Sequence, residues 1–323
     1  MKFERYSESK DFLNDVLEVL REDAAINISV IWGLISESET SRSIFEDLIT
    51  EGTDENCKKI LHNQVRLFWN HPKRLLATVK DSCGSVLLTA YCNHPYKKLT
   101  LYATRREVNP GAVKLLIDEL KSLGYGLPRI WAERSLTECF KEVCGGDFIK
   151  HSSVLVMQAD KIAEMPPASG FYRIMNEKDL FFAPFWQAEC LKACNLDFES
   201  LDELHSYLQY ATRDNSAYSA YLWEDKFPVS QAIINCEIDT CSQISDVYTP
   251  PFYRKKGYAT SLVSALTHLI LTERGKRNSM LLSDADNPTS CSIYRKIGYR
   301  EVAVLNEVSI VMRRNVQSNF KNT

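Results

Sequence analysis

The stretch Val247–Ala259, VYTPPFYRKKGYA, constrains the fold of this chain more than any other. It predicts the end of a strand, a basic loop with one glycine, and the start of a helix whose apolar residues recur at helical spacing up to position 270. The first N–H groups of a helix have no partner within it, and the helix dipole adds positive charge there. Gly257 lacks the Cβ that would keep an anion away from the backbone. We therefore expect an anion site here, most naturally for a phosphate.

A second patterned stretch follows at residues 279–301. It opens with a strand-like run, and Asn287-Pro288 then predicts a helix start, because Asn can cap a helix and Pro is tolerated in its first turn. Gly298 fits the position just past the end of that helix. Tyr294 lies on this short helix, where by itself it is typical of a half-buried core tyrosine.

Both stretches resemble signatures of the GNAT superfamily of acyl-CoA N-acyltransferases. Arg254-x-x-Gly257-x-Ala259 is similar to its (Gln/Arg)-x-x-Gly-x-(Gly/Ala) loop, and Asn-Pro with a tyrosine seven residues after the Asn is similar to its second signature. The resemblance implies that the anion is the pyrophosphate of coenzyme A and that Tyr294 returns a proton to the CoA sulfur. The residues expected to bind the cofactor are Val247, Tyr248, Thr249, Arg254, Lys255, Lys256, Gly257, Tyr258, Ala259, Thr260 and Asn287.

A general base is harder to assign. Asp246 precedes the bend of the strand and has the best position, so the predicted catalytic residues are Tyr294 and Asp246. Each candidate carboxylate can also be a surface group or a helix cap, and members of the family often use water chains instead. The other candidates are Glu237, Asp239, Asp284 and Asp286.

The chain also predicts two similar halves. Pro166–Gly170 cannot continue a helix or a strand and indicates a linker. Each half repeats the order strand–helix–strand–helix–strand, which resembles tandem GNAT proteins. We expect an α+β (mixed α/β) fold of two GNAT-like units, residues 1–160 and 171–315, each a mostly antiparallel mixed sheet flanked by helices, with a splayed central strand pair in the second. Residues 105–111 lack the loop motif, so we expect no CoA pyrophosphate there.

Composition excludes several other classes of protein. A net charge of −3 argues against a nucleic-acid surface. No window holds the roughly 18 uninterrupted apolar residues of a membrane span, and the start lacks the pattern of a signal peptide, so we expect no membrane partner and a cytoplasmic location. The 10 cysteines include no C-x-x-C pair, and we expect no metal site. Four of them lie on predicted helices as small buried or half-buried thiols: Cys139, Cys144, Cys190 and Cys194.

With the resemblance, the sequence predicts an acyl-CoA-dependent N-acyltransferase. The co-substrate is expected to be acetyl-CoA or another acyl-CoA, and the acceptor a primary amine that attacks directly in a ternary complex. A small-molecule amine is favoured over a protein, and the chain is expected to be a monomer or homodimer. The alternative is a catalytically inactive CoA-binding protein with a regulatory or scaffolding role.

Overall fold

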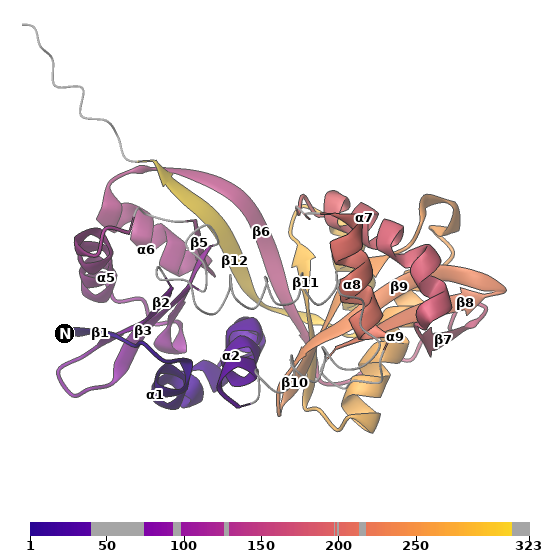
Figure 1. Cartoon of the computed structure of the whole chain (residues 1–323), viewed down its shortest axis with the longest axis horizontal. Helices are drawn as coiled ribbons and strands as arrows, with labels where there is room; N and C mark the ends of the chain where they lie inside the picture. The colour runs from indigo at the N-terminus through magenta and orange to yellow at the C-terminus, as the bar shows by residue number, and fades with distance from the viewer. Residues whose placement is uncertain are drawn as a thin grey trace, which may run out of the picture. The chain divides into compact units, whose positions relative to one another are not determined.

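The computed structural model describes residues 1–39, 74–92, 98–125, 129–196, 198, 200–212 and 218–311 of the 323-residue chain (Figure 1). Those residues divide into two compact units. Unit 1 draws on Met1–Tyr6, Lys73–Ser153 and Leu305–Thr323, and unit 2 on Ser7–Pro72 and Val154–Val304. The units therefore interleave along the sequence. The proposed domains 1–160 and 171–315 remain a prediction about which segments fold together.

Unit 1 contains a mixed sheet in which one pair of neighbours, β4 and β5, is parallel and the others are antiparallel. Its strands, in spatial order, are β1 (Lys2–Arg5), β2 (Leu75–Lys80), β3 (Val86–Cys92), β4 (Leu99–Ala103), β5 (Ile130–Glu133) and the end of β12 (Arg300–Val311). A short 3-10 helix, η1 (Thr104–Arg106), follows β4.

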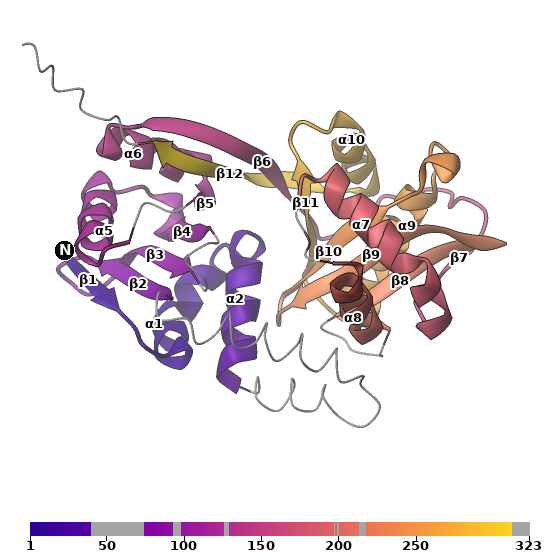
Figure 2. The same ribbon diagram turned by 45° about the horizontal axis from the view of Figure 1, so that its top comes forward.

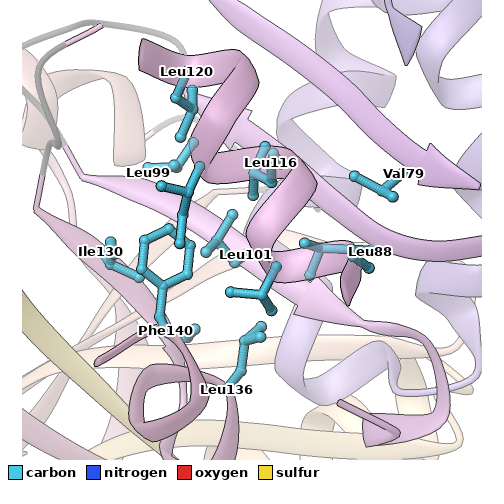
Figure 3. Packing of buried hydrophobic residues seen from close by; sticks show 14 of the residues in the cluster. Val79, Leu88, Leu99, Leu101, Leu116, Leu120, Ile130, Leu136 and Phe140 are labelled. Carbon is cyan, nitrogen blue, oxygen red and sulfur yellow. The ribbon is translucent and has the colours of Figure 1, made fainter. Parts of the chain in front are cut away.

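Two helices, α5 (Pro110–Ser122) and α6 (Arg134–Cys144), pack on this sheet. Asn109 caps α5, and Pro110 stands in its first turn, where a missing N–H costs nothing. The apolar face of α5 meets alternating residues of the strands, as Leu116 and Leu101 show among the labelled side chains of Figure 3. This cluster is the core of unit 1.

Unit 2 repeats the same pairing. The parallel neighbours are β10 and β11, and the other pairs are antiparallel. Its strands, in spatial order, are β7 (Phe171–Ile174), β8 (Ser219–Asp225), β9 (Phe227–Glu237), β10 (Cys241–Tyr248), β11 (Asn278–Asp284) and the second half of β6 (Asp147–Ala159).

The strands belong to one 12-stranded sheet, and in each unit one strand comes from the other half of the sequence. Residues Val154–Ala159 of β6 end the N-terminal half but pair with β11, while Leu305–Val308 of β12 end the C-terminal half and pair with β5. The predicted mostly antiparallel mixed arrangement of strands in each unit is thus confirmed, and the exchange of β6 and β12 is added to it.

Helices cover both faces of the unit 2 sheet (Figure 2). Ile233 of β9 packs with Leu208 of α8, whereas its neighbours Ala232 and Ile234 pack with Leu262 of α9. Side chains alternate between the faces of a strand, so α8 and α9 lie on opposite faces. The helices are α1 (Ser9–Arg21), α2 (Ala24–Glu39), η2 (Glu177–Phe181), α7 (Ala183–Ala193), α8 (Leu201–Ala211), η3 (Pro251–Tyr253), α9 (Tyr258–His268), η4 (Leu269–Glu273) and α10 (Pro288–Ile297).

The segment Pro166–Gly170 is held against unit 2. The Ala168 N–H donates to Ser261 Oγ at 2.8 Å, and Trp223 Nε1 donates to the Ser169 carbonyl at 2.8 Å. Gly170 has φ +107°, and a Cβ there would lie 2.2 Å from the Glu224 carbonyl oxygen. The predicted linker is therefore fastened along one unit. In the parts of the chain that the structure describes, no helix is long and apolar enough to cross a bilayer.

Candidate functional site

The central strands of unit 2 separate at the end where the basic loop begins. Parallel pairing of β10 with β11 runs from Cys241↔Asn278 to Ile244↔Leu281. Beyond that point, β11 continues beside β6 and β10 continues beside β9. The last residues of β10 therefore lose a neighbour on one side, which confirms the predicted splay and leaves backbone groups free to meet a ligand.

A bulge at Asp246 bends β10 within this splayed part. The register with β9 shifts between Ser245 and Tyr248, so β10 carries one extra residue there. Asp246 has φ +53°, in the left-handed region, which Asp tolerates better than most residues because its short polar side chain can bond locally. The bulge turns Asp246 out of the regular alternation of the strand.

Two glutamines hold the Asp246 carboxylate. Gln187 Nε2 of α7 donates to Asp246 Oδ2 at 2.8 Å, and Gln231 Nε2 of β9 donates to Gln187 Oε1 at 2.9 Å. Burial raises the pKa of Asp246, and the bond from Gln187 opposes that rise. A carboxylate with a raised pKa binds a proton more readily than a surface carboxylate. The sequence analysis missed both glutamines, although Gln231 in the middle of an apolar strand was a signal.

Tyr207 of α8 lies close to this carboxylate. Its side chain is 36% exposed, yet burial raises its pKa well above the usual value, with Asp246 and Cys236 adding to the rise and a hydrogen bond with Asn235 opposing it. No sequence pattern pointed to Tyr207.

The other carboxylates considered from sequence have structural roles. Glu237 forms ion pairs with Arg274 at 2.7 Å and Lys276 at 3.0 Å. Asp239 pairs with Arg21 at 3.0 Å. The remaining two candidates shape the turn before α10, where the Asp286 N–H donates to Asp284 Oδ1 at 2.9 Å. Asp246 is thus the candidate whose carboxylate is buried beside the splayed strand.

Side chains of β9 and of the loop itself brace the basic loop. Ser230 Oγ donates to the Tyr248 carbonyl at 3.0 Å and lies 2.9 Å from Thr249 Oγ1. Arg254 Nε donates to the Thr249 carbonyl at 2.9 Å, so this arginine closes the loop onto the end of β10. Its neighbours Lys255 and Lys256 are exposed.

Helix α9 begins without a side-chain cap. Gly257 is its N-cap residue at φ +84° and provides no side-chain cap, and the first turn of α9 holds no acidic residue. The N–H groups of Tyr258, Ala259 and Thr260 therefore lie at the N-terminal end of α9. No acidic residue in this turn offsets the positive end of the helix dipole. The Tyr258 hydroxyl is engaged elsewhere, since it donates to Asp225 Oδ2 at 2.6 Å. Tyr258 can therefore contact the cofactor only through its backbone N–H.

Asp225 anchors the start of α9 to the hairpin between β8 and β9. Besides Tyr258, Ser169 Oγ donates to Asp225 Oδ2 at 2.6 Å. These two bonds, with that from Ser169 the larger cause, lower the pKa of Asp225. The anchoring fixes the direction of the first turn of α9, and the sequence analysis did not anticipate it.

Tyr294 lies on α10, the helix that follows β11, and β11 is the strand from which β10 separates. Asn287 caps this helix, with Oδ1 accepting from the Ser290 N–H at 3.1 Å, as its sequence position predicted. Tyr294 is buried, and burial is the main cause that raises its pKa. Among the described residues its hydroxyl makes no hydrogen bond, whereas the hydroxyl of its ring neighbour Tyr299 lies 2.7 Å from Ser279 Oγ. Tyr294 stays protonated at neutral pH and has a proton to donate.

The end of α7 connects the two sides of the site. Cys190 Sγ lies 3.9 Å from the Val247 carbonyl oxygen, and Cys190 and Cys194 both add to the rise in the pKa of Tyr294. Helix α7 thus contacts Val247 through Cys190 and Asp246 through Gln187. The assignment of Asp246 and Tyr294 as catalytic residues stays a prediction.

Comparison with known proteins agrees with this architecture. Residues 226–308 match the family model of FR47-like proteins. A GNAT-family acetyltransferase from Colwellia psychrerythraea is 12% identical, with 96% of this chain and 100% of that chain covered and a TM-score of 0.53. A tandem GNAT protein from the clavulanic acid biosynthesis pathway is 11% identical, with 96% and 98% covered and a TM-score of 0.53.

A Drosophila protein of known structure is similar over the same extent, at 14% identity, with 96% of this chain and 98% of that chain covered and a TM-score of 0.57. A search of curated proteins finds no match. The chain has the fold of the GNAT superfamily, in the tandem arrangement that its sequence predicted.

Proposed function

We propose that the chain is an acyl-CoA-dependent N-acyltransferase, most simply with acetyl-CoA, that transfers its acyl group to a primary amine. The observation that carries the proposal is the uncapped start of α9, which follows, after the basic loop, a strand splayed away from its neighbour. A base candidate, Asp246, and an acid candidate, Tyr294, accompany it. An anion site alone would support binding only, and the two titratable groups are what favour turnover.

The chain offers a consistent set of groups to hold the CoA phosphates. The free N–H groups of the first turn of α9 point along the helix axis, and Gly257 leaves room there, since the nearest atom to a Cβ at this position is Ala168 Cβ at 3.7 Å. Lys255 and Lys256 add positive charge at the rim. The Asn287 amide nitrogen remains available at the start of α10, because its Oδ1 is the atom used by the cap.

The proposed chemistry needs one proton to leave the amine and one to reach the CoA sulfur. Asp246 accepts the first, helped by its raised pKa. The amine nitrogen then attacks the thioester carbonyl, and the N–H groups of Val247 and Thr249 meet the charge that develops on its oxygen. As the carbon–sulfur bond breaks, Tyr294 donates its proton to the departing thiolate. The acyl group passes directly from sulfur to nitrogen.

For the acceptor we propose a small amine. The Asp246 carboxylate lies close enough to Tyr207, which also bonds to Asn235, to affect its pKa. A buried carboxylate there attracts an ammonium group and then removes its proton. The competing proposal, a CoA-binding protein without turnover, predicts the same binding but gives Asp246 no role.

Acetyl-CoA consumption over a panel of small amines and peptides tests this function. We expect turnover with at least one small primary amine and a loss of about 100- to 10,000-fold in Asp246→Asn. Binding of CoA, measured separately by calorimetry, should be equal in both proteins. Tight CoA binding with no turnover across the panel would favour the binding-only alternative.

A further inference from the structure

A pair of cysteines occupies the last turn of α7. Cys190 and Cys194 are four residues apart, and the Cys194 N–H donates to the Cys190 carbonyl at 3.1 Å, so both lie on one face of the turn. Cys190 is 4% exposed, whereas Cys194 is exposed. The sequence analysis expected small buried or half-buried thiols, and this is wrong for Cys194 because α7 ends there and its side chain reaches solvent.

The two thiols interact with each other. The neighbouring Cys190 thiol stabilises negative charge on Cys194 and is the main cause that lowers the pKa of Cys194 to about 7. Cys194 and burial raise the pKa of Cys190. Thiolates rather than thiols are nucleophiles, so Cys194 is the reactive member and Cys190 is the second thiol beside it.

The pair also touches the groups assigned to acyl transfer. Cys190 Sγ lies 3.9 Å from the Val247 carbonyl oxygen on the splayed strand. Gln187, less than one turn earlier on α7, donates to Asp246. Any change in the last turn of α7 therefore reaches both the strand that meets the thioester and the proposed base.

We propose that Cys190 and Cys194 are a redox-active dithiol, which a small-molecule disulfide converts into an intramolecular disulfide, and that this modification slows acyl transfer. The second part rests on the proposed function, and the first part does not.

The reaction balances with a disulfide oxidant such as oxidised glutathione. The Cys194 thiolate attacks one sulfur of the oxidant, forms a mixed disulfide and releases one thiolate, which takes up a proton. Cys190 then loses its proton, and its sulfur attacks the Cys194 sulfur and releases the second thiol. The chain loses two electrons and two protons, and the oxidant is reduced to two thiols.

Helical geometry explains why this modification would affect the site. Side chains four apart on a helix have Cβ atoms roughly 5–6 Å apart, whereas a disulfide needs about 3.5–4.5 Å. The last turn of α7 must therefore move when the bond forms. Cys190 is then drawn away from Val247, and the bond from Gln187 to Asp246 is disturbed.

Oxidation followed by peptide mapping tests the first part. The full chain is treated with oxidised glutathione, remaining thiols are alkylated, and disulfide-linked peptides are identified by mass spectrometry. We expect a Cys190–Cys194 link in the wild-type chain and in Cys83→Ser, an exposed cysteine of unit 1 that serves as the control. Glutathione retained on Cys194 with no internal link, or alkylation of both thiols, would overturn the proposal.

Kinetics on the same samples test the second part. We expect oxidation to lower kcat by about 10- to 100-fold, the scale of a small misplacement of reacting groups, and a reducing agent to restore it. CoA affinity should change less than kcat, because the proposed phosphate site at the start of α9 lies on another element than α7. Cys194→Ser should be insensitive to the oxidant. An internal link with unchanged kcat would overturn this part, whereas a reduced chain without turnover would contradict the proposed function and leave the mapped link standing.

Discussion

Helices α5 and α9 hold equivalent places in the two units, and they begin differently. Each follows the strand that enters the parallel pair of its sheet, and each is preceded by residues with positive φ, Arg105 at +54° in one and Lys255 at +64° in the other. At the start of α5, Asn109 Oδ1 accepts from the Ala112 N–H at 3.1 Å. At the start of α9, Gly257 offers no such group.

The start of α5 is closed in two further ways. Pro110 has no N–H to offer in the first turn. The Met1 side chain lies over Gly111, with Cε 2.7 Å from where a Cβ on that glycine would be. The N–H groups at the start of α5 are therefore capped or covered, whereas those at the start of α9 are not capped.

This contrast separates fold from binding. Both sheets have the same order of parallel and antiparallel pairs, so topology alone does not decide which unit takes a phosphate. The local chemistry of the helix start decides it, through a cap, a proline and a covering side chain. We accordingly propose one CoA site per chain, in unit 2.

The variant with the largest expected effect tests whether unit 2 catalyses acyl transfer in addition to binding CoA. Tyr294→Phe should lower turnover by about 100- to 10,000-fold, because the proton donor is lost while the ring still packs. CoA affinity should remain nearly unchanged. Steady-state kinetics and calorimetry together measure both quantities.

Tyr299→Phe is the matched control for that variant. Its hydroxyl bonds to Ser279 and Thr267 within the core, so its loss should reduce the free energy of unfolding by about 1–3 kcal/mol with little effect on kcat. Full activity in Tyr294→Phe would show that another group or water donates the proton.

Asp246→Asn should reveal the raised pKa of this carboxyl. In the wild type, kcat/KM should rise with pH until the group is ionised, and the variant should lack that limb. The same raised pKa affects stability. Because the pKa of Asp246 is higher in the folded than in the unfolded chain, protonation of Asp246 stabilises the fold. This contribution is fully present below the unfolded pKa and is lost as pH rises through the folded pKa.

Asparagine cannot ionise and tolerates the positive φ, so Asp246→Asn should match the wild type in acid and be more stable than it at higher pH. Urea unfolding of both proteins at an acidic and a neutral pH measures this. A wild type that gains stability relative to the variant as pH rises would show that Asp246 is instead stabilised as the anion.

Gly257→Asp should weaken CoA binding by about tenfold or more, because it places bulk and negative charge at the open helix start, and each 1.4 kcal/mol is a factor of ten. Gly84→Asp is the control, since Gly84 has a similar φ of +89° in a hairpin of unit 1 with no atom near its Cβ position. The control should share the backbone strain and retain CoA binding. Equal losses of affinity in both variants would attribute the effect to strain.

The smallest expected effect concerns the closed helix. Asn109→Ala should lower the free energy of unfolding by about 1 kcal/mol, because the cap of α5 is lost. It should not create a second CoA site, since Pro110 and Met1 remain in place. Chemical denaturation and calorimetry check the two expectations, and a second binding event would show that the cap alone closes unit 1.

The sequence predicted those parts of the molecule that depend on local patterns. The strand, loop and helix around Gly257 and the cap at Asn287 follow from residues close in the chain, whereas the splay before Thr249 was implied by the family resemblance. The exchange of β6 and β12 between units depends on long-range pairing, which no local pattern encodes.

The same limit applies to the site. Gln187 reaches Asp246 across 59 positions of sequence, and Gln231 reaches Gln187 across 44. The exposure of Cys194 depended on where α7 ends, which is one of the least predictable features of a helix. Asp246 was chosen as the base candidate from its place before the bend, but the burial that raises its pKa was not predictable.

Calorimetric titration of the full chain with CoA tests the central claim most directly. The account predicts one site per chain, which Gly257→Asp weakens and Asn109→Ala does not multiply. Two equivalent sites would contradict the contrast between the helix starts. No binding at all would contradict the assignment of the open start of α9 to a CoA phosphate.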